Sequence, residues 1–103
     1  EIRDAGVYVR EGDWTSARDL WTQVYNRQKK GKTKFKAAYN IALSYEMTGD
    51  MEKATEWLSH ASEYASEGSQ EELALKYYIE QFRKRKSEYG KLNIQMGRFG
   101  DNF

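Results

Sequence analysis

The stretch that decides the fold is KAAYNIALSYEMTGDMEKATEWLSHASEY, residues 36–64. Before Thr48 its apolar residues recur three and four positions apart, the spacing of one helix face: Ala38, Ile41, Ala42 and Tyr45. After Asp50 the same spacing returns in Ala54, Trp57, Leu58, Ala61 and Tyr64. Gly49 suits a left-handed helix C-terminus, and Asp50 suits the N-cap of the next helix. The stretch therefore predicts two antiparallel helices joined by a tight turn.

A partial copy of this pattern lies 37 residues earlier in the chain. The matching positions are Ala5, Tyr8, Gly12, Asp13 and Ala17, which return as Ala42, Tyr45, Gly49, Asp50 and Ala54. A helical repeat of this length is typical of array proteins, which bury apolar faces between neighbouring repeats and commonly bind partners on one curved surface. Glu1 and Asp4 occupy slots that are apolar in the complete copy, so we expect the first helix to be short.

A third helix continues the register. Its apolar positions each follow the second copy by 37 residues and are Leu75, Tyr78, Ile79 and Phe82. Lys86 and Ser87 then replace the Gly-Asp turn, which predicts a polar capping helix over about 70–96 rather than a third hairpin. We therefore expect one domain over 1–97, with repeat 1 at about 1–28 and repeat 2 at about 34–66. A flexible tail is expected over 97–103.

These residues resemble the tetratricopeptide repeat. Ala42, Ala54 and Ala61 stand where that motif has small residues. Its larger apolar slots hold Ala38, Ile41, Tyr45 and Leu58, and Ser66 stands where the family often has proline. The resemblance implies an all-α, right-handed superhelical array of antiparallel hairpins that binds a protein or peptide and performs no catalysis.

The resemblance also implies a binding surface on the concave face of the first helix of each repeat. The residues that it places there are Arg10 from repeat 1, Lys36, Tyr39, Asn40, Leu43 and Met47 from repeat 2, and Tyr77 and Glu80 from the third helix. The Asn40 amide can both donate to and accept from an extended peptide backbone. Members that hold a chaperone's C-terminal carboxylate need basic residues where this chain has Leu73 and Tyr77, so that activity is not carried over.

Other partners stay open at this point. The sequence is also similar to the C-terminal repeat part of uncharacterised bacterial envelope lipoproteins, which implies a spacer that docks an N-terminal domain of the same protein. The first residue is Glu rather than Met, so we expect a fragment of a longer chain. Both cytoplasm and bacterial envelope are open as compartments, and the resemblance favours the envelope. A homodimer through Ile2 and Val7 is a further alternative.

Nucleic-acid binding is the less favoured alternative. Residues 29–36 hold five lysines and Phe35, which would contact phosphates and stack on a base, respectively. A single short basic loop is a weak electrostatic footprint, so we interpret the run as a solvated loop. The same interpretation applies to the basic run at residues 83–86.

Composition argues against an enzyme. The chain has no cysteine and one histidine, His60, so it cannot build a thiolate site, a histidine metal cluster or a catalytic triad. Its glutamates, Glu46 among them, lack calcium-loop spacing and are expected to be solvated. We therefore expect no catalytic residue, cofactor or metal. The apolar stretches fall far short of the ~20 residues that span a bilayer.

Overall fold

The structure, a computed structural model, describes the backbone of residues 4–100 and the side chains of residues 4–88. Its five helices are α1 (Ala5–Arg10), α2 (Trp14–Arg27), α3 (Lys32–Met47), α4 (Met51–Tyr64) and α5 (Gln70–Gly100), and the described residues form no strand. The all-α prediction is thus confirmed.

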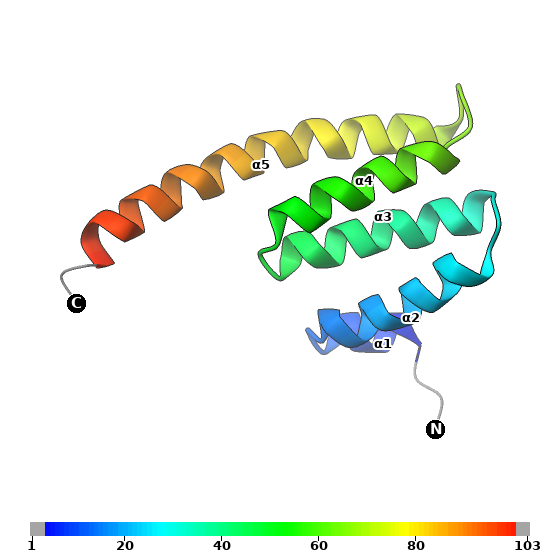
Figure 1. Cartoon of the computed structure of the whole chain (residues 1–103), viewed down its shortest axis with the longest axis horizontal. Helices are drawn as coiled ribbons and strands as arrows, with labels where there is room; N and C mark the ends of the chain where they lie inside the picture. Colours follow the sequence, from blue (N-terminus) through cyan, green and yellow to red (C-terminus); the bar gives the residue numbers. More distant parts are fainter. Residues whose placement is uncertain (1–3, 101–103) are drawn as a thin grey trace.

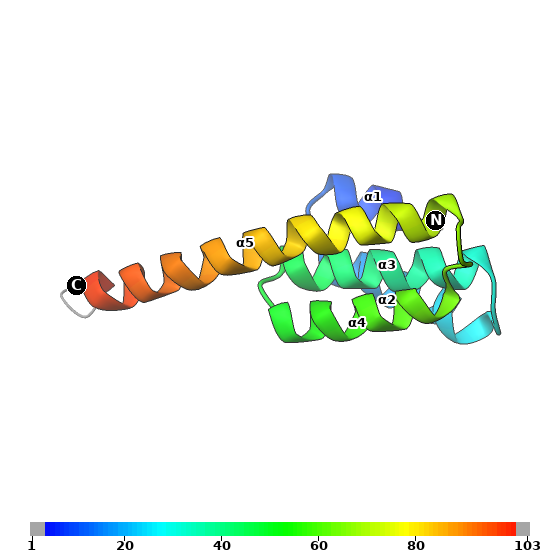
Figure 2. The ribbon, with the colours of Figure 1, turned by 90° about the horizontal axis from the view of Figure 1, so that it is seen from above.

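Each helix lies beside the one that follows it in the chain (Figure 1). Turned by 90°, α1 and α5 lie on one side of the molecule and α4 on the other (Figure 2). The last helix is much the longest, and its C-terminal half extends past the ends of α3 and α4 in both views. The molecule is therefore a row of stacked helices with a projecting C-terminal arm.

Aspartates begin three of the helices. The side-chain oxygens of Asp4, Asp13 and Asp50 each accept a hydrogen bond of 3.0 Å from the backbone N–H three residues later. The glycines before the last two, Gly12 and Gly49, have φ of 78° and 87°, a conformation that favours glycine. The predicted Gly-Asp turns are confirmed. Asp4, placed as an N-cap, also explains why α1 has only six residues.

The core lies mainly between α3 and α4. The buried apolar side chains come from the predicted helix faces and include Ala38, Ile41, Ala42, Ala54, Leu58 and Ala61, joined by Leu75 and Phe82 of α5. Alanines without exposed surface at the crossing let the two helix axes approach closely. The same faces that the three- and four-residue spacing predicted therefore form the core.

An arginine closes the junction between α2 and α3. Arg18 Nε donates to Ser44 Oγ over 2.8 Å, and its Nη2 donates to the Ser44 carbonyl over 3.0 Å and to Thr48 Oγ1 over 2.7 Å. Its guanidinium carbon lies 3.7 Å from the ring centroid of Tyr45. One side chain of α2 thus binds the last turn of α3 through the Ser44 carbonyl and two hydroxyl groups.

The lysine run is helical rather than a loop from Lys32 onward. Gly31, with φ of 97°, precedes the first turn of α3. Phe35 consequently falls on the inner face of that turn and is buried among the core residues. The interpretation of the run as a solvated loop is therefore wrong from Lys32 onward, and Phe35 is not exposed for the base stacking that the nucleic-acid alternative requires.

The C-terminal helix also differs from the expectation of a tail from residue 97. The helix continues to Gly100, and residues 101–103 lie outside the described part. A glycine inside a helix costs about 1 kcal/mol relative to alanine, which does not end a helix in a segment without proline. Ile2, one of the two residues named for a homodimer, also lies outside the described residues.

Candidate functional site

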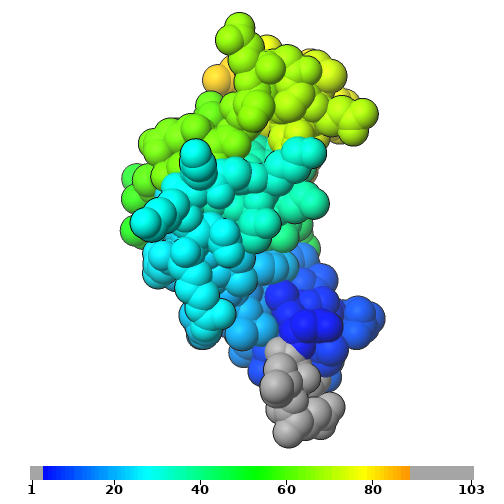
Figure 3. Space-filling model, turned by 90° about the vertical axis from the view of Figure 1, so that its right-hand side faces the viewer, coloured from blue at the N-terminus to red at the C-terminus, as the bar shows by residue number. Residues whose placement is uncertain are grey.

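Two neighbouring hollows run along the line between α3 and α5. The first, of about 460 Å³, is lined by Phe35, Lys36, Tyr39, Asn40, Gln70, Glu71 and Ala74. The second, of about 470 Å³, is lined by Tyr39, Leu43, Glu46, Met47, Tyr77, Tyr78, Gln81 and Arg85. Because the hollows share Tyr39, we treat them together and name them the α3–α5 groove. The space-filling view shows the surface set back over α3, between α1 and the start of α5 (Figure 3).

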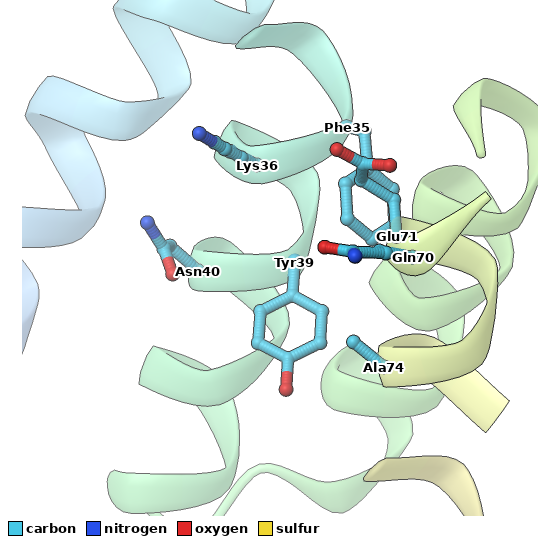
Figure 4. A pocket seen from close by; sticks show the side chains of 7 residues that line it. All are labelled: Phe35, Lys36, Tyr39, Asn40, Gln70, Glu71 and Ala74. Carbon is cyan, nitrogen blue, oxygen red and sulfur yellow. The ribbon is translucent and has the colours of Figure 1, made fainter. Parts of the chain in front are cut away.

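Six of the eight residues predicted for the binding surface line this groove. Lys36, Tyr39 and Asn40 lie along α3 in the first hollow, opposite the first turns of α5 (Figure 4). Leu43, Met47 and Tyr77 line the second hollow. The structure therefore brings together residues that the sequence separates by up to 41 positions (77 − 36), while their role in binding stays a prediction.

The other two predicted residues do not line the groove. Arg10 is exposed at the end of α1, a helix that packs against α2 and against no other described helix. Glu80 lies on the solvent side of α5, because neighbouring positions such as Tyr78 and Gln81 face α3, and its nearest cation is Lys84 at 4.0 Å. Arg10 and Glu80 are thus exposed but lie outside the lining of the groove.

Apolar side chains from two helices are exposed in the second hollow. Met47 of α3 is 54% exposed and Tyr77 of α5 is 67% exposed, and half-buried Leu43 belongs to the same lining, one turn before Met47 on α3. Large apolar side chains that gather on one surface are more informative than single ones, because they mark places where a partner removes them from water. This hollow is therefore the apolar part of the groove.

Tyr39 belongs to the framework of the groove. Its ring centroid lies 5.9 Å from that of Phe35 and 5.0 Å from that of Tyr78, so it joins the buried start of α3 to α5. Burial raises the pKa of Tyr39, and the nearby Arg85 partly opposes the rise. A change at Tyr39 would therefore disturb packing as well as any contact with a ligand.

A buried carboxylate connects the two helices at one end of the groove. Glu46 is only 4% exposed at its side chain. Its oxygens accept from Arg85 Nε over 2.6 Å, from Arg85 Nη2 over 3.0 Å and from the Tyr78 hydroxyl over 2.5 Å. The expectation of a solvated Glu46 is wrong. Glu46 is buried because it binds Tyr78 and Arg85, which lie 32 and 39 residues later in the chain. The local helical spacing around Glu46 does not predict contacts at such a distance.

The same contacts keep this carboxylate charged. Burial by itself raises the pKa of Glu46, but the hydrogen bonds from Arg85 and Tyr78 outweigh it and hold the pKa below its ordinary value. Burial and the adjacent carboxylate together raise the pKa of the Tyr78 hydroxyl. Both carboxylate oxygens are therefore occupied, and the group serves as a structural ion pair rather than an acid or a base.

The lysine run has partners within the chain. Lys34 Nζ donates to the Gln28 carbonyl over 2.8 Å and lies 4.3 Å from the Tyr25 ring centroid. Lys32 lies 3.7 Å from Glu71 of α5. Two of the five lysines therefore contact groups of the chain itself at the start of α3.

Residues 4–88 contain no group of His, Cys, Asp and Glu side chains that is suited to a metal ion. Within the described part of the chain, none of the helices combines the length and the apolar character needed to cross a bilayer.

Comparison with known proteins identifies the family of the chain. Residues 3–84 match a family described as Domain of unknown function (DUF6340), and this range includes the first four helices and the α3–α5 groove except for Arg85. No curated protein and no solved structure matches the chain.

Proposed function

The chain belongs to the DUF6340 family, and from that premise and the groove geometry we propose that it is a non-catalytic protein-interaction module. In this proposal the helices form a right-handed superhelical array of tetratricopeptide type, and the α3–α5 groove holds a short segment of a partner protein. The observation that carries the proposal is the second hollow, where Met47 and Tyr77 from different helices leave more than half of each side chain in water.

The groove offers two kinds of contact in a row. The second hollow presents Leu43, Met47 and Tyr77, which suit an apolar side chain of the partner. Adaptable methionine and amphipathic tyrosine are enriched at protein interfaces for this reason. The first hollow presents Lys36 and the Asn40 amide, which can bind backbone groups of the same segment. The partner is therefore a segment with an apolar anchor followed by polar contacts.

Affinity capture from an extract of the source cells, analysed by mass spectrometry, tests this proposal. The informative variant is Met47→Ala/Tyr77→Ala, because both side chains are exposed and their loss leaves the core intact. Leu73→Ala is the matched control, since Leu73 is 64% exposed on α5 but lines neither hollow. We expect the parent and the control to retain a protein that the double variant loses.

A captured protein must then bind directly. Titration calorimetry with the purified partner should show that Met47→Ala/Tyr77→Ala weakens binding at least about tenfold, which corresponds to about 1.4 kcal/mol. If all three forms retain the same proteins, or none, the groove is not the interaction surface. Circular dichroism of each variant establishes that the helices remain formed.

A further inference from the structure

A third hollow lies between α4 and α5. It has a volume of about 290 Å³ and is lined by Thr55, Leu58, Ser59 and Ser62 of α4 and by Ile79, Phe82, Arg83 and Lys86 of α5. It shares no lining residue with the α3–α5 groove. We name it the α4–α5 hollow, and the proposed groove function does not use it.

The repeat explains why this hollow exists. Arg18 fills the junction between α2 and α3, but 37 residues later the equivalent position holds Thr55, whose side chain is much shorter. The position equivalent to Thr48 holds Arg85, which turns to Glu46 on α3 instead of toward α4. No arginine equivalent to Arg18 therefore fills the second junction, and Arg83 and Lys86 line the hollow that remains.

The lining combines an apolar floor with polar walls. Leu58 and Phe82 are almost fully buried and form the floor with half-buried Ile79. On α4, Ser59 and Ser62 line the hollow, and Ser59 Oγ donates a long hydrogen bond of 3.4 Å to the Thr55 carbonyl of its own helix. These hydroxyls are therefore able to donate to a bound group.

The cations of the hollow lack acidic partners. In the basic run of residues 83–86, Arg85 binds Glu46, and Lys84 lies 4.0 Å from Glu80. Among the described residues, no carboxylate forms an ion pair with Arg83 or Lys86, which lie three residues apart on α5 and both line the hollow. The site thus has two positive charges above an apolar floor, and the chain supplies no described negative charge to match them.

We propose that the α4–α5 hollow binds a small organic anion, a carboxylate or phosphate monoester carried on a compact apolar group. The acid group would lie between Arg83 and Lys86 with the serine hydroxyls opposite, because charge-assisted hydrogen bonds to such a group are short and strong. The apolar group would cover Leu58, Ile79 and Phe82. A volume of about 290 Å³ lies at the lower end of the range for ligand sites, which restricts the body to about one ring.

The test is a titration of the full chain with phenyl phosphate, followed by the amide shifts of Ser59, Ser62 and Ile79. Benzyl alcohol, which has the ring without the charge, and inorganic phosphate, which has the charge without the ring, are run beside it. We expect phenyl phosphate to bind at least about tenfold more tightly than either, because each alternative loses one half of the site. Equal affinity for phenyl phosphate and benzyl alcohol would overturn the proposal.

A charge-matched pair of variants locates the site. Arg83→Gln/Lys86→Gln removes the two cations from the hollow, and Arg10→Gln/Lys29→Gln removes two exposed cations elsewhere. We expect the first pair to weaken phenyl phosphate binding at least about tenfold and the second to leave it unchanged at fixed salt. If both pairs weakened phenyl phosphate binding equally, the effect would come from net charge alone, and this result would contradict a binding site in the hollow.

Vesicles identify the source of the anion. Phosphatidylcholine vesicles with and without phosphatidic acid present the same phosphate monoester on a lipid. Binding of phenyl phosphate without vesicle binding supports a free small molecule. Vesicle binding that competes with phenyl phosphate and needs Arg83 and Lys86 supports a lipid headgroup in the same hollow. Vesicle binding that survives Arg83→Gln/Lys86→Gln, without phenyl phosphate binding, overturns the proposal.

Discussion

The junction between α2 and α3 and the junction between α4 and α5 occupy equivalent places in the repeat. An arginine fills the first, whereas the second contains a hollow. At the first, Arg18 reaches across to Ser44, Tyr45 and Thr48. At the second, the arginine is Arg85, which lies on the later helix and reaches to Glu46 on α3. Arg85 connects α5 to α3 at one end of the α3–α5 groove, and Thr55, in the place of Arg18, leaves the α4–α5 hollow unfilled. The repeat register therefore sets where helices pack, and single charged residues decide which junctions stay open.

The largest effect is expected from Arg85→Ala. The change leaves the buried Glu46 carboxylate without its cation, and we expect the free energy of unfolding to fall by about 3 kcal/mol, the lower end for broken buried pairs because Arg85 is partly exposed. Urea denaturation measures it. Arg83→Ala is the control and should change stability by less than about 0.5 kcal/mol. Equal losses in both variants would show that the ion pair does not hold α5.

Arg18→Ala tests the first junction. We expect a loss of about 2 kcal/mol, because the change removes charge-assisted hydrogen bonds to Ser44 and Thr48 and the contact with the Tyr45 ring. The loss should be smaller than for Arg85→Ala, since the Ser44 hydroxyl keeps its bond of 2.6 Å to the Ile41 carbonyl. Arg27→Ala, on the same helix but exposed, is the control in the same urea experiment.

Acid should weaken the Glu46–Arg85 contact between α3 and α5 more than the Arg18 contacts between α2 and α3. The pKa of Glu46 is lowered in the folded chain, so its contribution is fully present above the ordinary value of 4.5 and is lost as the pH falls through the folded value. Arg18 faces neutral groups and makes no such contribution. Stability measured between pH 6 and pH 3 should therefore fall less steeply in Glu46→Gln than in the parent. An identical slope in both would contradict the assigned pKa direction.

The smallest effect on stability is expected from Thr55→Arg, which places an arginine where the first junction has Arg18. The new side chain should fill the α4–α5 hollow and change the free energy of unfolding by no more than about 0.5 kcal/mol, because position 55 is exposed. Phenyl phosphate binding should disappear although net positive charge has increased. Tighter binding by this variant would mean that the hollow attracts anions by charge alone.

Local spacing predicted most of the helical framework. Ala42, Ala54 and Ala61 were placed in the core from their three- and four-residue periods, and Gly49 and Asp50 form the expected turn. These features depend on residues close in sequence, where helix geometry relates position to face. The tetratricopeptide arrangement itself stays a proposal.

The rest depends on contacts between distant residues. Glu46 has the same local setting as any surface glutamate, and only Arg85 and Tyr78 make it a buried ion pair. Likewise Phe35 followed a run of lysines that suggested a loop, but packing against α4 and α5 extended the helix back to Lys32. The resemblance implied the binding residues, and those on α3 line the groove, whereas Arg10 and Glu80 do not, because their positions depend on how whole helices pack.

The Glu46–Arg85 contact lies at the middle of α5, and the half of the helix that follows it projects beyond the other helices (Figure 1). Fifteen residues of helix follow Arg85 up to Gly100, and at 1.5 Å per residue they form an arm of about 22 Å. If this half of α5 tilted by about 10° at the Glu46–Arg85 contact, its end would move by about 4 Å. If a segment binds in the α3–α5 groove as proposed, it would contact α5 at Tyr77 and Arg85, and a change of tilt there would displace the far end of the helix.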